Sequence, residues 1–429
     1  MKNSLVWFRN DLRITDNSVL FDACADSDKV FAAYCFDPRQ YTTGDFGFVK
    51  TGKFRAKFLI QTVTDLRYQL SRLNIPLFIS LKRPEDYIPG LIEKHNITQI
   101  YFQEEWTRDE KYVENQLRLK IPEEVEILNQ YDQFLFHPED IPFDDFSQIP
   151  KVFTAFRKKL EKYAEVRKTL SIPEPLPREN HIENSSELPS LADLGHTPFS
   201  LDERTAFPFE GGETAGLKRI DEYIWESENI AKYKETRNGL VGKDYSSKFS
   251  AWLANGSLSA RTIYWEVRKF EKERIKNSST YWMIFELIWR DFFKYISLKH
   301  GDSIFHLGGI LNKDYSWRSD RETLRSWIKG RTKYDFVNSN MRELAATGWM
   351  SNRGRQNVAS FLAKEMEQDW RIGASYFESM LIDYDVHSNW GNWMYNAGVG
   401  NDPRDRRFNI ERQAEMYDGD HEFRNLWKT

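Results

Sequence analysis

One stretch of the sequence places three serine hydroxyls and a lysine just ahead of a predicted helix. Residues 244–250 read Asp-Tyr-Ser-Ser-Lys-Phe-Ser. Hydroxyls, an ammonium group and the free N–H groups of a helix start together bind anions such as phosphate, because the helix dipole adds to their donors. Serines in this place are also ordinary helix N-caps. The stretch therefore predicts a phosphate site or a plain cap, and residue types alone do not separate the two.

Two later segments set charged and amide side chains among aromatic and apolar ones. Residues 347–357 contain Asn352 and Arg355, and residues 381–395 contain Asp383 and Asp385. Because an isolated buried charge is costly, an arginine and an aspartate in such surroundings are expected to pair. A polar site inside a helical domain would use such a pair, and so would ordinary helix packing.

A basic stretch with interleaved aromatic residues runs from residue 231 to residue 280. It holds eleven Lys and Arg against five Asp and Glu, with aromatic rings at Tyr233, Tyr245, Trp252, Tyr264 and Trp265. Cations combined with stacking aromatics are typical of single-stranded nucleic-acid binding. A solvated helix face would give the same count, so the stretch is compatible with both.

Histidines and cysteines do not form a metal-binding pattern. None of the eight histidines pairs with another histidine or a cysteine at ligand spacing, and His300 and His306 are six residues apart. Having only Cys24 and Cys35 fits a reducing compartment. The formal net charge of -4 excludes a uniformly basic coat, and no apolar stretch is long enough to cross a bilayer. We expect a cytoplasmic protein without a metal or a membrane anchor.

The elements that must position these residues divide the 429-residue chain into three parts. An α/β domain is predicted over 1–130, where apolar runs alternate with helical patterns and favour a parallel, doubly wound sheet. Its expected strands are 4–8, 30–36, 76–80, 97–102 and 125–128. The turn after the first strand, Arg9 to Arg13, has no glycine, so the dinucleotide-binding fingerprint is absent. A proline-punctuated connector with one helix near 151–168 is predicted over 131–209, and an all-α domain over 210–429.

Tryptophan is unevenly distributed along the chain. Aromatic residues make up 15% of the sequence, and all 14 tryptophans except Trp7 and Trp106 lie from Trp225 onward. A helical domain with a tryptophan-rich core explains this distribution as well as a function does.

Long motifs in a fixed order resemble the photolyase/cryptochrome family over nearly the whole chain. They include WFRNDLRITDN, KTGKFRAKFLIQTVTDLR, YKETRNGLVGKDYSSKFSAWLANGSLSAR and FELIWRDFFKY. The segments TGWMSNRGRQNVASFLAKEMEQDWRIGASYFESMLIDYDV and SNWGNWMYNAGVGNDPR are similar to the DASH branch. The resemblance implies an α/β antenna domain, a connector and a helical FAD-binding domain.

The same resemblance implies an FAD site, position by position. Arg355 and Asp383 match an ion pair beside the flavin ring, and Asp385 matches a contact to the ring edge. Asn389 matches the residue that faces the flavin N5, and Glu286 a carboxylate near the adenine and the lesion, so these two are the expected catalytic residues. Positions near the phosphates and sugar match Tyr233, Ser246, Ser247, Lys248, Phe249 and Ser250. One departure is His387, where the DASH pattern has cysteine, and it is expected to affect the flavin.

Electron-transfer, lesion and antenna positions follow from the same match. Trp393, Trp370 and Trp317 correspond to a chain of three tryptophans from the flavin to the surface. A lesion pocket is implied at Trp289, Asn352, Gln356 and Tyr395, with Arg353 placed to meet a DNA phosphate. Gln356 and Tyr395 stand where duplex-repairing photolyases have Met and Trp, which favours single strands. Glu105 matches a carboxylate that binds a methenyltetrahydrofolate antenna.

These matches predict a light-driven lyase. The expected reaction is blue-light repair of cyclobutane pyrimidine dimers by electron transfer from reduced FAD, preferentially in single-stranded DNA, by a monomer. A blue-light photoreceptor or DNA-binding signalling protein with little repair activity is the alternative. A dark nucleotide-binding enzyme that uses the α/β domain is disfavoured by the missing glycine turn.

Overall fold

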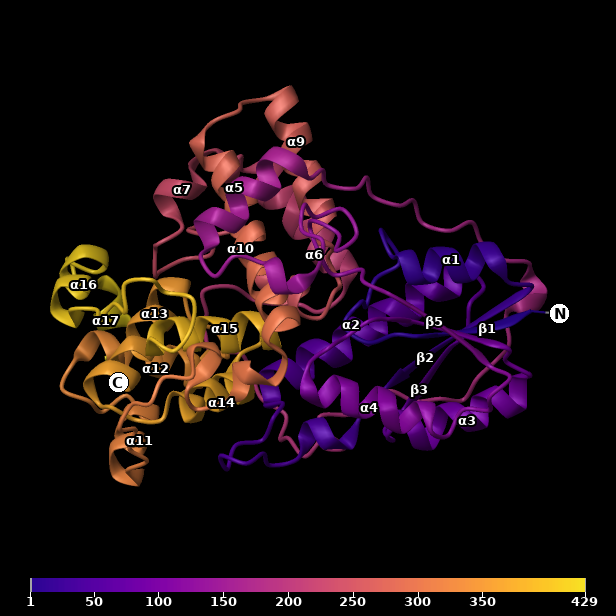
Figure 1. Cartoon of the computed structure of the whole chain (residues 1–429), viewed down its shortest axis with the longest axis horizontal. Helices are drawn as coiled ribbons and strands as arrows, with labels where there is room; N and C mark the ends of the chain where they lie inside the picture. Colours follow the sequence, from indigo (N-terminus) through magenta and orange to yellow (C-terminus); the bar gives the residue numbers. More distant parts are fainter. Residues whose placement is uncertain (1, 429) are drawn as a thin grey trace.

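A five-stranded, fully parallel sheet forms the N-terminal domain of the computed structural model, which describes residues 2–428. Its strand order is β3-β2-β1-β4-β5, so the chain winds outward from β1 in both directions. The strands are β1 (Asn3–Trp7), β2 (Lys29–Cys35), β3 (Leu77–Ser80), β4 (Gln99–Gln103) and β5 (Glu126–Gln130). This confirms the doubly wound sheet, and each strand overlaps its predicted range (Figure 1).

Alternate residues of the strands build two separate cores. Val6 packs with helices α1 (Ser18–Asp26) and α2 (Lys53–Arg72) on one face of the sheet. Leu5 packs with α3 (Pro84–His95) and α4 (Arg108–Arg118) on the other. Successive side chains of a strand point to opposite faces. A strand covered on both faces can be apolar at successive positions, which is why β2 and β3 read as nearly continuous hydrophobic runs.

Helices make up the C-terminal part of the chain, as predicted. The longest is α10 (Ser278–His300), which runs through the centre of this part (Figure 1). The others are α6 (Glu213–Ile220), α7 (Tyr233–Thr236), α8 (Ser250–Ala254), α9 (Ala260–Glu273), α11 (Arg321–Ile328), α12 (Asp335–Thr347), α13 (Asn352–Ser360), α14 (Trp370–Met380), α15 (Val386–Ala397), α16 (Ile410–Tyr417) and α17 (Glu422–Leu426). Two π-helical turns, Asp221–Glu226 and Phe361–Glu365, extend α6 and α13.

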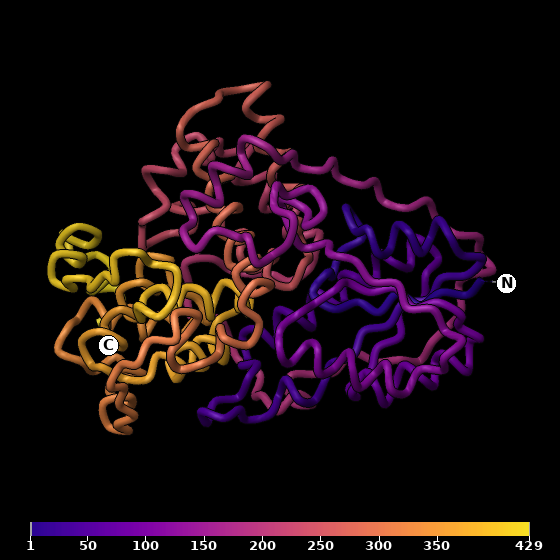
Figure 2. The backbone as a smooth tube through the Cα atoms, viewed as in Figure 1, coloured from indigo at the N-terminus to yellow at the C-terminus, as the bar shows by residue number. Residues whose placement is uncertain are grey.

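The segment between the two domains contacts both of them. Its helix, α5 (Phe153–Tyr163), is shorter than the predicted 151–168 and packs on α10. The chain then runs in extended form along the N-terminal domain (Figure 2). There Leu176 N–H donates to the Leu73 carbonyl over 3.1 Å, and the Asn180 side chain pairs with the backbone of Val30. The domain boundaries at 130/131 and 209/210 stay predictions.

A buried ion network holds the glycine-free turn after β1 against the helical domain. Arg13 donates to the Asp132 carboxylate, which also accepts from Arg261 of α9 over 2.7 Å. Arg261 binds Asp16 as well, over 2.9 Å. Gly256 packs so closely against this turn that a Cβ atom there would lie 1.9 Å from the Asn10 carbonyl oxygen. The turn therefore makes a domain contact in place of a phosphate cradle.

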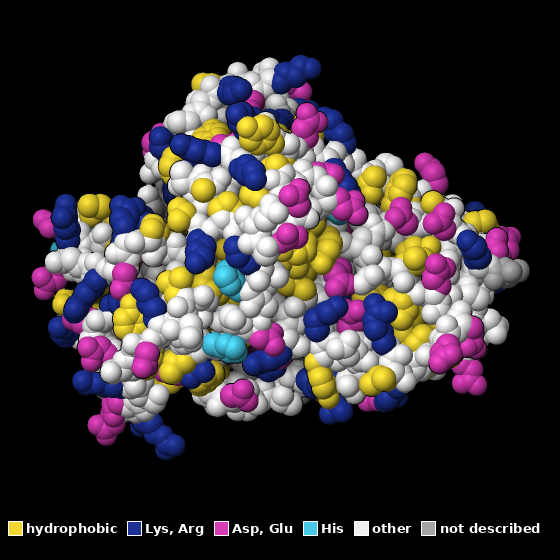
Figure 3. All heavy atoms as spheres, viewed as in Figure 1, with side chains coloured by type: hydrophobic (Ala, Val, Ile, Leu, Met, Phe, Trp, Pro, Cys, Tyr) yellow, Lys and Arg dark blue, Asp and Glu magenta, His cyan; other side chains and the backbone are white. Residues whose placement is uncertain are grey.

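Charges of both signs are interspersed on the molecular face shown in Figure 3. Within residues 2–428, no helix is both long and apolar enough to cross a membrane. In the same residues, no group of three or more His, Cys, Asp or Glu side chains could hold a metal ion.

Candidate functional site

A cavity of about 550 Å³ opens between α10, α13, α15 and the 244–250 loop. A recess of about 70 Å³ adjoins it and contains Asn389 and Trp393. The cavity gathers predicted residues that lie up to 162 positions apart in the sequence (233 to 395). Those residues are Tyr233, Ser246, Ser247, Lys248, Phe249, Ser250, Glu286, Trp289, Asn352, Arg353, Arg355, Gln356, Asp383, Asp385 and Tyr395.

The 244–250 loop directs a buried cation to this cavity. Lys248 has a φ of 64° and is 2% exposed. Its Nζ lies 3.0 Å from the centre of the Tyr245 ring, and it has no hydrogen-bond partner within residues 2–428. Burial lowers the pKa of Lys248 well below its usual value. The serines do not cap α8, which has no side-chain cap, so the interpretation as a plain helix cap does not hold and the anion site stays a prediction.

Arg219, which was not identified from the sequence, holds this loop in place. Its Nε donates to the Ser247 carbonyl over 3.0 Å, and one terminal nitrogen reaches the Asp244 carboxylate over 3.2 Å. The only sign of it in the sequence was an arginine in the last turn of an amphipathic helix. The loop is therefore held in shape by a cation that does not line the cavity.

The predicted pair between Arg355 and Asp383 is present. One terminal nitrogen of Arg355 donates to both Asp383 carboxylate oxygens at 2.9 Å. The Ser250 hydroxyl donates to the same carboxylate over 2.7 Å, which ties α8 to the segment before α15. Arg355 also lies 5.2 Å above the Trp349 ring. The pair forms one wall of both the cavity and its recess.

Asp385 lies where this cavity meets a second, smaller one. Its ion-pair partner is Lys294, which was not identified from the sequence. Lys294 Nζ donates to Asp385 over 3.2 Å and to the Gln133 side-chain oxygen over 2.5 Å. Burial would raise the pKa of Asp385, but the charges of Lys294 and Arg290 hold it well below its usual range. Burial lowers the pKa of Lys294 to about 8. The sign of Lys294 in the sequence was a lysine among the apolar residues of α10.

The outer part of the cavity combines aromatic rings with paired charges. Glu286 forms an ion pair with Arg237 at 2.8 Å, a partner not foreseen from the sequence. Burial raises the pKa of Glu286, and Arg237 opposes this rise. The rings of Trp289 and Tyr395 stand nearly perpendicular, with centroids 6.0 Å apart.

Arg353 is bound within the protein rather than extended toward solvent. It donates to the Gln356 side-chain oxygen over 2.9 Å and to the Asn238 side chain over 3.0 Å. The Tyr417 ring covers its guanidinium at 4.4 Å. Meeting a phosphate, as predicted, would require Arg353 to exchange these bonds.

The three predicted electron-transfer tryptophans occupy different depths. Trp393 lines the recess, Trp370 is fully buried, and Trp317 is half-buried beside Tyr315. Trp317 is brought close to Trp370 by a backbone hydrogen bond of 2.8 Å from Asp369 to Arg318. The nearest ring partner of Trp370 is Trp390, at 5.7 Å. Trp370 and Trp393 belong to one hydrophobic core of the helical domain, and Trp317 packs against that core.

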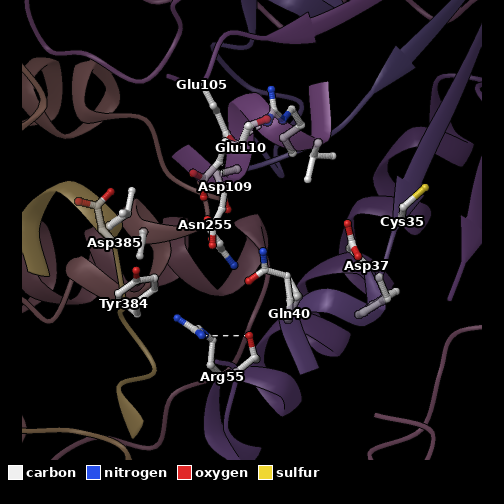
Figure 4. A pocket seen from close by; sticks show the side chains of 18 of the residues that line it. Cys35, Asp37, Gln40, Arg55, Glu105, Asp109, Glu110, Asn255, Tyr384 and Asp385 are labelled. Carbon is white, nitrogen blue, oxygen red and sulfur yellow. Dashed lines mark hydrogen bonds and ion pairs between the residues drawn. The ribbon is translucent and has the colours of Figure 1, made fainter. Parts of the chain in front are cut away.

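A second cavity, of about 210 Å³, lies between the sheet domain and the helical domain. Glu105 lines this cavity and is 4% exposed. It is therefore buried, although it stands in a polar stretch just before a helix. It accepts one hydrogen bond from Asn10 over 2.8 Å and pairs with Arg9 at 3.2 Å. Figure 4 shows Tyr384 and Asp385 of the helical domain facing Gln40 and Arg55 across this space. Asp385 thus lines both cavities.

His387 faces this second cavity and does not line the first. Its ring stacks on Trp106 at 4.6 Å, and its Nδ1 shares a 2.7 Å hydrogen bond with Ser297. Burial and the nearby Lys294 lower the pKa of His387 well below its usual value, so the ring is neutral. Asp385, which lines both cavities, can transmit an influence of His387 to the larger one.

Glu343 is a buried acid that was not identified from the sequence. It is 1% exposed, and one carboxylate oxygen has no hydrogen-bond partner in the described chain. Burial raises its pKa from 4.5 to about 8, against the opposing charges of Lys248 and Arg355. Glu343 is therefore held partly protonated behind the Lys248 loop.

Replacing Glu343 by glutamine should make the stability of the protein less sensitive to pH between 4.5 and about 8. Between pH 4.5 and about 8 the folded chain keeps a proton that the unfolded chain releases, so stability falls as pH rises across this window. In the Glu343→Gln variant, which lacks this group, the free energy of unfolding should fall less across the window, by on the order of 5 kcal/mol. Urea unfolding at both ends of the window measures this, with exposed Glu411→Gln as the control. Equal pH slopes in Glu343→Gln and the unsubstituted chain would contradict it.

Comparison with known proteins relates the N-terminal and the C-terminal parts of the chain to the same family. Residues 4–178 match the DNA photolyase family model, and residues 282–428 match the FAD binding domain of DNA photolyase. Cryptochrome DASH of Gloeobacter violaceus is 49% identical over 428 residues, which cover 99% of this chain and 85% of that relative. A Synechocystis cryptochrome structure superposes with a TM-score of 0.94 at 45% identity, covering 100% of this chain and 88% of that one. A class III photolyase from Agrobacterium tumefaciens gives 0.83 at 25% identity, covering 100% and 86%.

The chain belongs to the photolyase/cryptochrome family and carries its FAD-binding domain. Within that family, its curated relatives at 43 to 49% identity are DASH cryptochromes. The predicted fold and family are thereby confirmed.

Residues of the larger cavity fit FAD chemically. A buried lysine without a partner suits a diphosphate, and the Arg355–Asp383 pair offers a polar edge to a ring system. FAD supplies one-electron chemistry, while the protein supplies the cavity, its charges and its exclusion of water. The roles of the individual residues remain predictions.

Proposed function

We propose that this protein repairs cyclobutane pyrimidine dimers in single-stranded DNA under blue light. When bound in its reduced form, FAD would supply the light-driven one-electron chemistry that splits the dimer and recovers the electron. The main support is that one cavity holds both the residues matched to FAD and those matched to the lesion. Trp289 and Tyr395 flank its outer part, where the two linked bases of the dimer would stack.

Glu286 and Asn389 carry the roles closest to chemistry in this proposal. Glu286 is positioned by Arg237, and its raised pKa favours a carboxyl group that donates a hydrogen bond to a pyrimidine carbonyl. Asn389 lies in the recess, where its amide donates to the Ala374 carbonyl over 3.0 Å. That bond fixes the side chain, so its oxygen can accept from a flavin N–H. In this proposal, Glu286 and Asn389 would hold or move protons during the electron transfer to the dimer.

We further propose that the second cavity holds a methenyltetrahydrofolate antenna. Glu105 would accept from the amino and N–H groups of the pterin, since it is a buried carboxylate on the cavity wall. Asp385 would link the two cavities, because it lines both. Folate-loaded and folate-free protein should differ in the action spectrum of repair, with added activity where the folate absorbs.

Repair of a dimer-containing single-stranded oligonucleotide is the decisive test. Reduced protein is illuminated with blue or near-ultraviolet light, and the recovered thymines are measured against a dark sample and an undamaged strand. Recovery in light alone is expected. Its absence would remove the enzyme assignment and leave the photoreceptor alternative, in which the same cavity responds to light without repair.

Replacing Gln356 by methionine together with Tyr395 by tryptophan should raise repair of duplex substrate. A larger stacking surface and an apolar contact should help to hold a flipped dimer, because stacking on an aromatic side chain contributes roughly 1–3 kcal/mol per base. We expect a roughly tenfold rise in the duplex-to-single-strand ratio of kcat/KM. Tyr68→Trp, at an exposed position on α2, is the control. An unchanged ratio would show that strand preference is set elsewhere.

A further inference from the structure

Trp390 is the tryptophan whose ring contacts Trp370 directly. The two rings meet edge to face, with centroids 5.7 Å apart, and Trp390 is 6% exposed. Trp317, in contrast, has its ring contact with Tyr315. Electron transfer between indoles is favoured by short separation, so a hole on Trp370 has a route to Trp390 that the predicted three-tryptophan chain does not include.

The N–H groups of these indoles have different acceptors. An indole that loses an electron becomes a strong acid at its nitrogen, and it is trapped as a neutral radical only when a base takes the proton. Trp370 donates to the Leu307 carbonyl over 3.0 Å, and a carbonyl cannot keep a proton. The Trp317 nitrogen is buried without a hydrogen-bond partner in residues 2–428. Trp390 donates to the Tyr384 hydroxyl over 3.3 Å.

Tyr384 continues the path to a carboxylate. Its hydroxyl interacts with Glu378, and Arg55 lies 4.6 Å above its ring. Burial raises the pKa of Glu378, while Arg55 and Lys50 oppose the rise, so this acid is a better base than an exposed one. Trp390, Tyr384 and Glu378 line a third cavity, of about 420 Å³, that adjoins the second. The path therefore ends in a space where a proton can leave.

We propose that Trp390, Tyr384 and Glu378 form a proton-coupled exit branch from Trp370, which rests on the proposed light-driven electron transfer. An electron passes from Trp390 to oxidised Trp370, which is oxidised by light through Trp393. The indole proton of Trp390 moves to the Tyr384 oxygen, and the Tyr384 hydroxyl proton moves to the Glu378 carboxylate. Charge balances: Trp370 is restored, Trp390 becomes a neutral radical, and Glu378 becomes protonated. An external thiol returns Trp390 to its starting state by giving one electron and one proton.

Transient absorption and EPR of the FAD-loaded protein after a light flash test the branch, because they distinguish a neutral tryptophan radical from its cation. Trp390→Phe keeps an aromatic ring against Phe305 and Trp370, and it should lower the yield of long-lived neutral radical roughly tenfold. Trp317→Phe, the matched variant of the other branch, should retain most of it. Tyr384→Phe should leave a radical cation on Trp390 that decays faster than the neutral radical of the unsubstituted protein.

Two results would overturn the branch: a full neutral-radical yield in Trp390→Phe with loss in Trp317→Phe, or unchanged radical protonation in Tyr384→Phe. The Tyr384 variant keeps the test available if Trp390→Phe does not fold, since it removes one oxygen from a half-buried ring. A protein that forms no tryptophan radical in any variant, the unsubstituted chain included, would contradict the proposed electron transfer itself. That outcome differs from failure of the branch alone.

Discussion

Asparagine in place of Asp383 should lower the free energy of unfolding by about 3 kcal/mol and release most of the FAD during gel filtration. Asp383 accepts two bonds from Arg355 and one from Ser250, and its side chain is 2% exposed. An amide has one acceptor oxygen and no charge, so it leaves Arg355 without its counterion beside an apolar cavity wall. Absorbance of FAD per chain and urea unfolding of the same preparation provide the two measurements.

A matched control separates loss of stability from loss of the site. Asp418 forms a similar ion pair with Arg424, at 2.7 Å and with 2% side-chain exposure, and it lines none of the three cavities. Asp418→Asn should destabilise the chain by a comparable amount and keep its FAD. If both variants lose FAD equally, the Arg355–Asp383 pair acts only through stability. If neither does, the pair is not part of the site.

The fold could be predicted because its signals are local. Leu5 and Val6 are adjacent apolar residues whose side chains must point to opposite faces of a strand, so their run indicates a sheet covered on both sides. The extent of α5 was less certain, because the residues after Tyr163 keep a polar composition while the backbone becomes extended. A sequence pattern specifies which face is apolar more exactly than where a helix ends.

Partners across the cavity were not predictable in the same way. The charge argument predicted only that an arginine and an aspartate in these segments pair, since buried charges need counterions. The choice of Arg355 and Asp383 came from the resemblance to the photolyase/cryptochrome family. Lys294 and Arg237 are also cations near apolar segments, but their partners Asp385 and Glu286 lie on other elements, 91 and 49 positions away. Many pairings satisfy charge balance, and only the packing of α10 against α7 and α15 selects one.

Glu105 and Trp390 show a second limit, that residue type does not reveal burial or contact. Glu105 follows β4 in a polar stretch, yet the two domains enclose it. Trp390 is one of 14 tryptophans, and nothing in its spacing separates it from core residues. Its contact with Trp370 depends on how α14 packs against α15.

Phenylalanine in place of Trp370 should slow photoreduction of FAD at least tenfold, while repair by chemically reduced protein stays within about twofold. Trp370 is fully buried and joins Trp393 to both outer tryptophans in the proposed path, so an electron from the surface must pass through it. Phenylalanine preserves the packing but is much harder to oxidise than indole. Flavin absorbance under continuous light with a thiol donor gives the photoreduction rate, and thymine recovery with pre-reduced protein gives the repair rate.

Trp327→Phe is the control that makes this result specific. Trp327 is as deeply buried as Trp370, and its ring contacts Trp393 directly at 6.1 Å. Its N–H donates to the Val358 carbonyl over 3.2 Å, so its radical cation has no proton acceptor. If Trp327→Phe slows photoreduction as much as Trp370→Phe, electrons reach Trp393 through the core rather than through Trp370. If Trp370→Phe abolishes repair by pre-reduced protein as well, the separation between photoreduction and repair is wrong, and Trp370 supports the cavity itself.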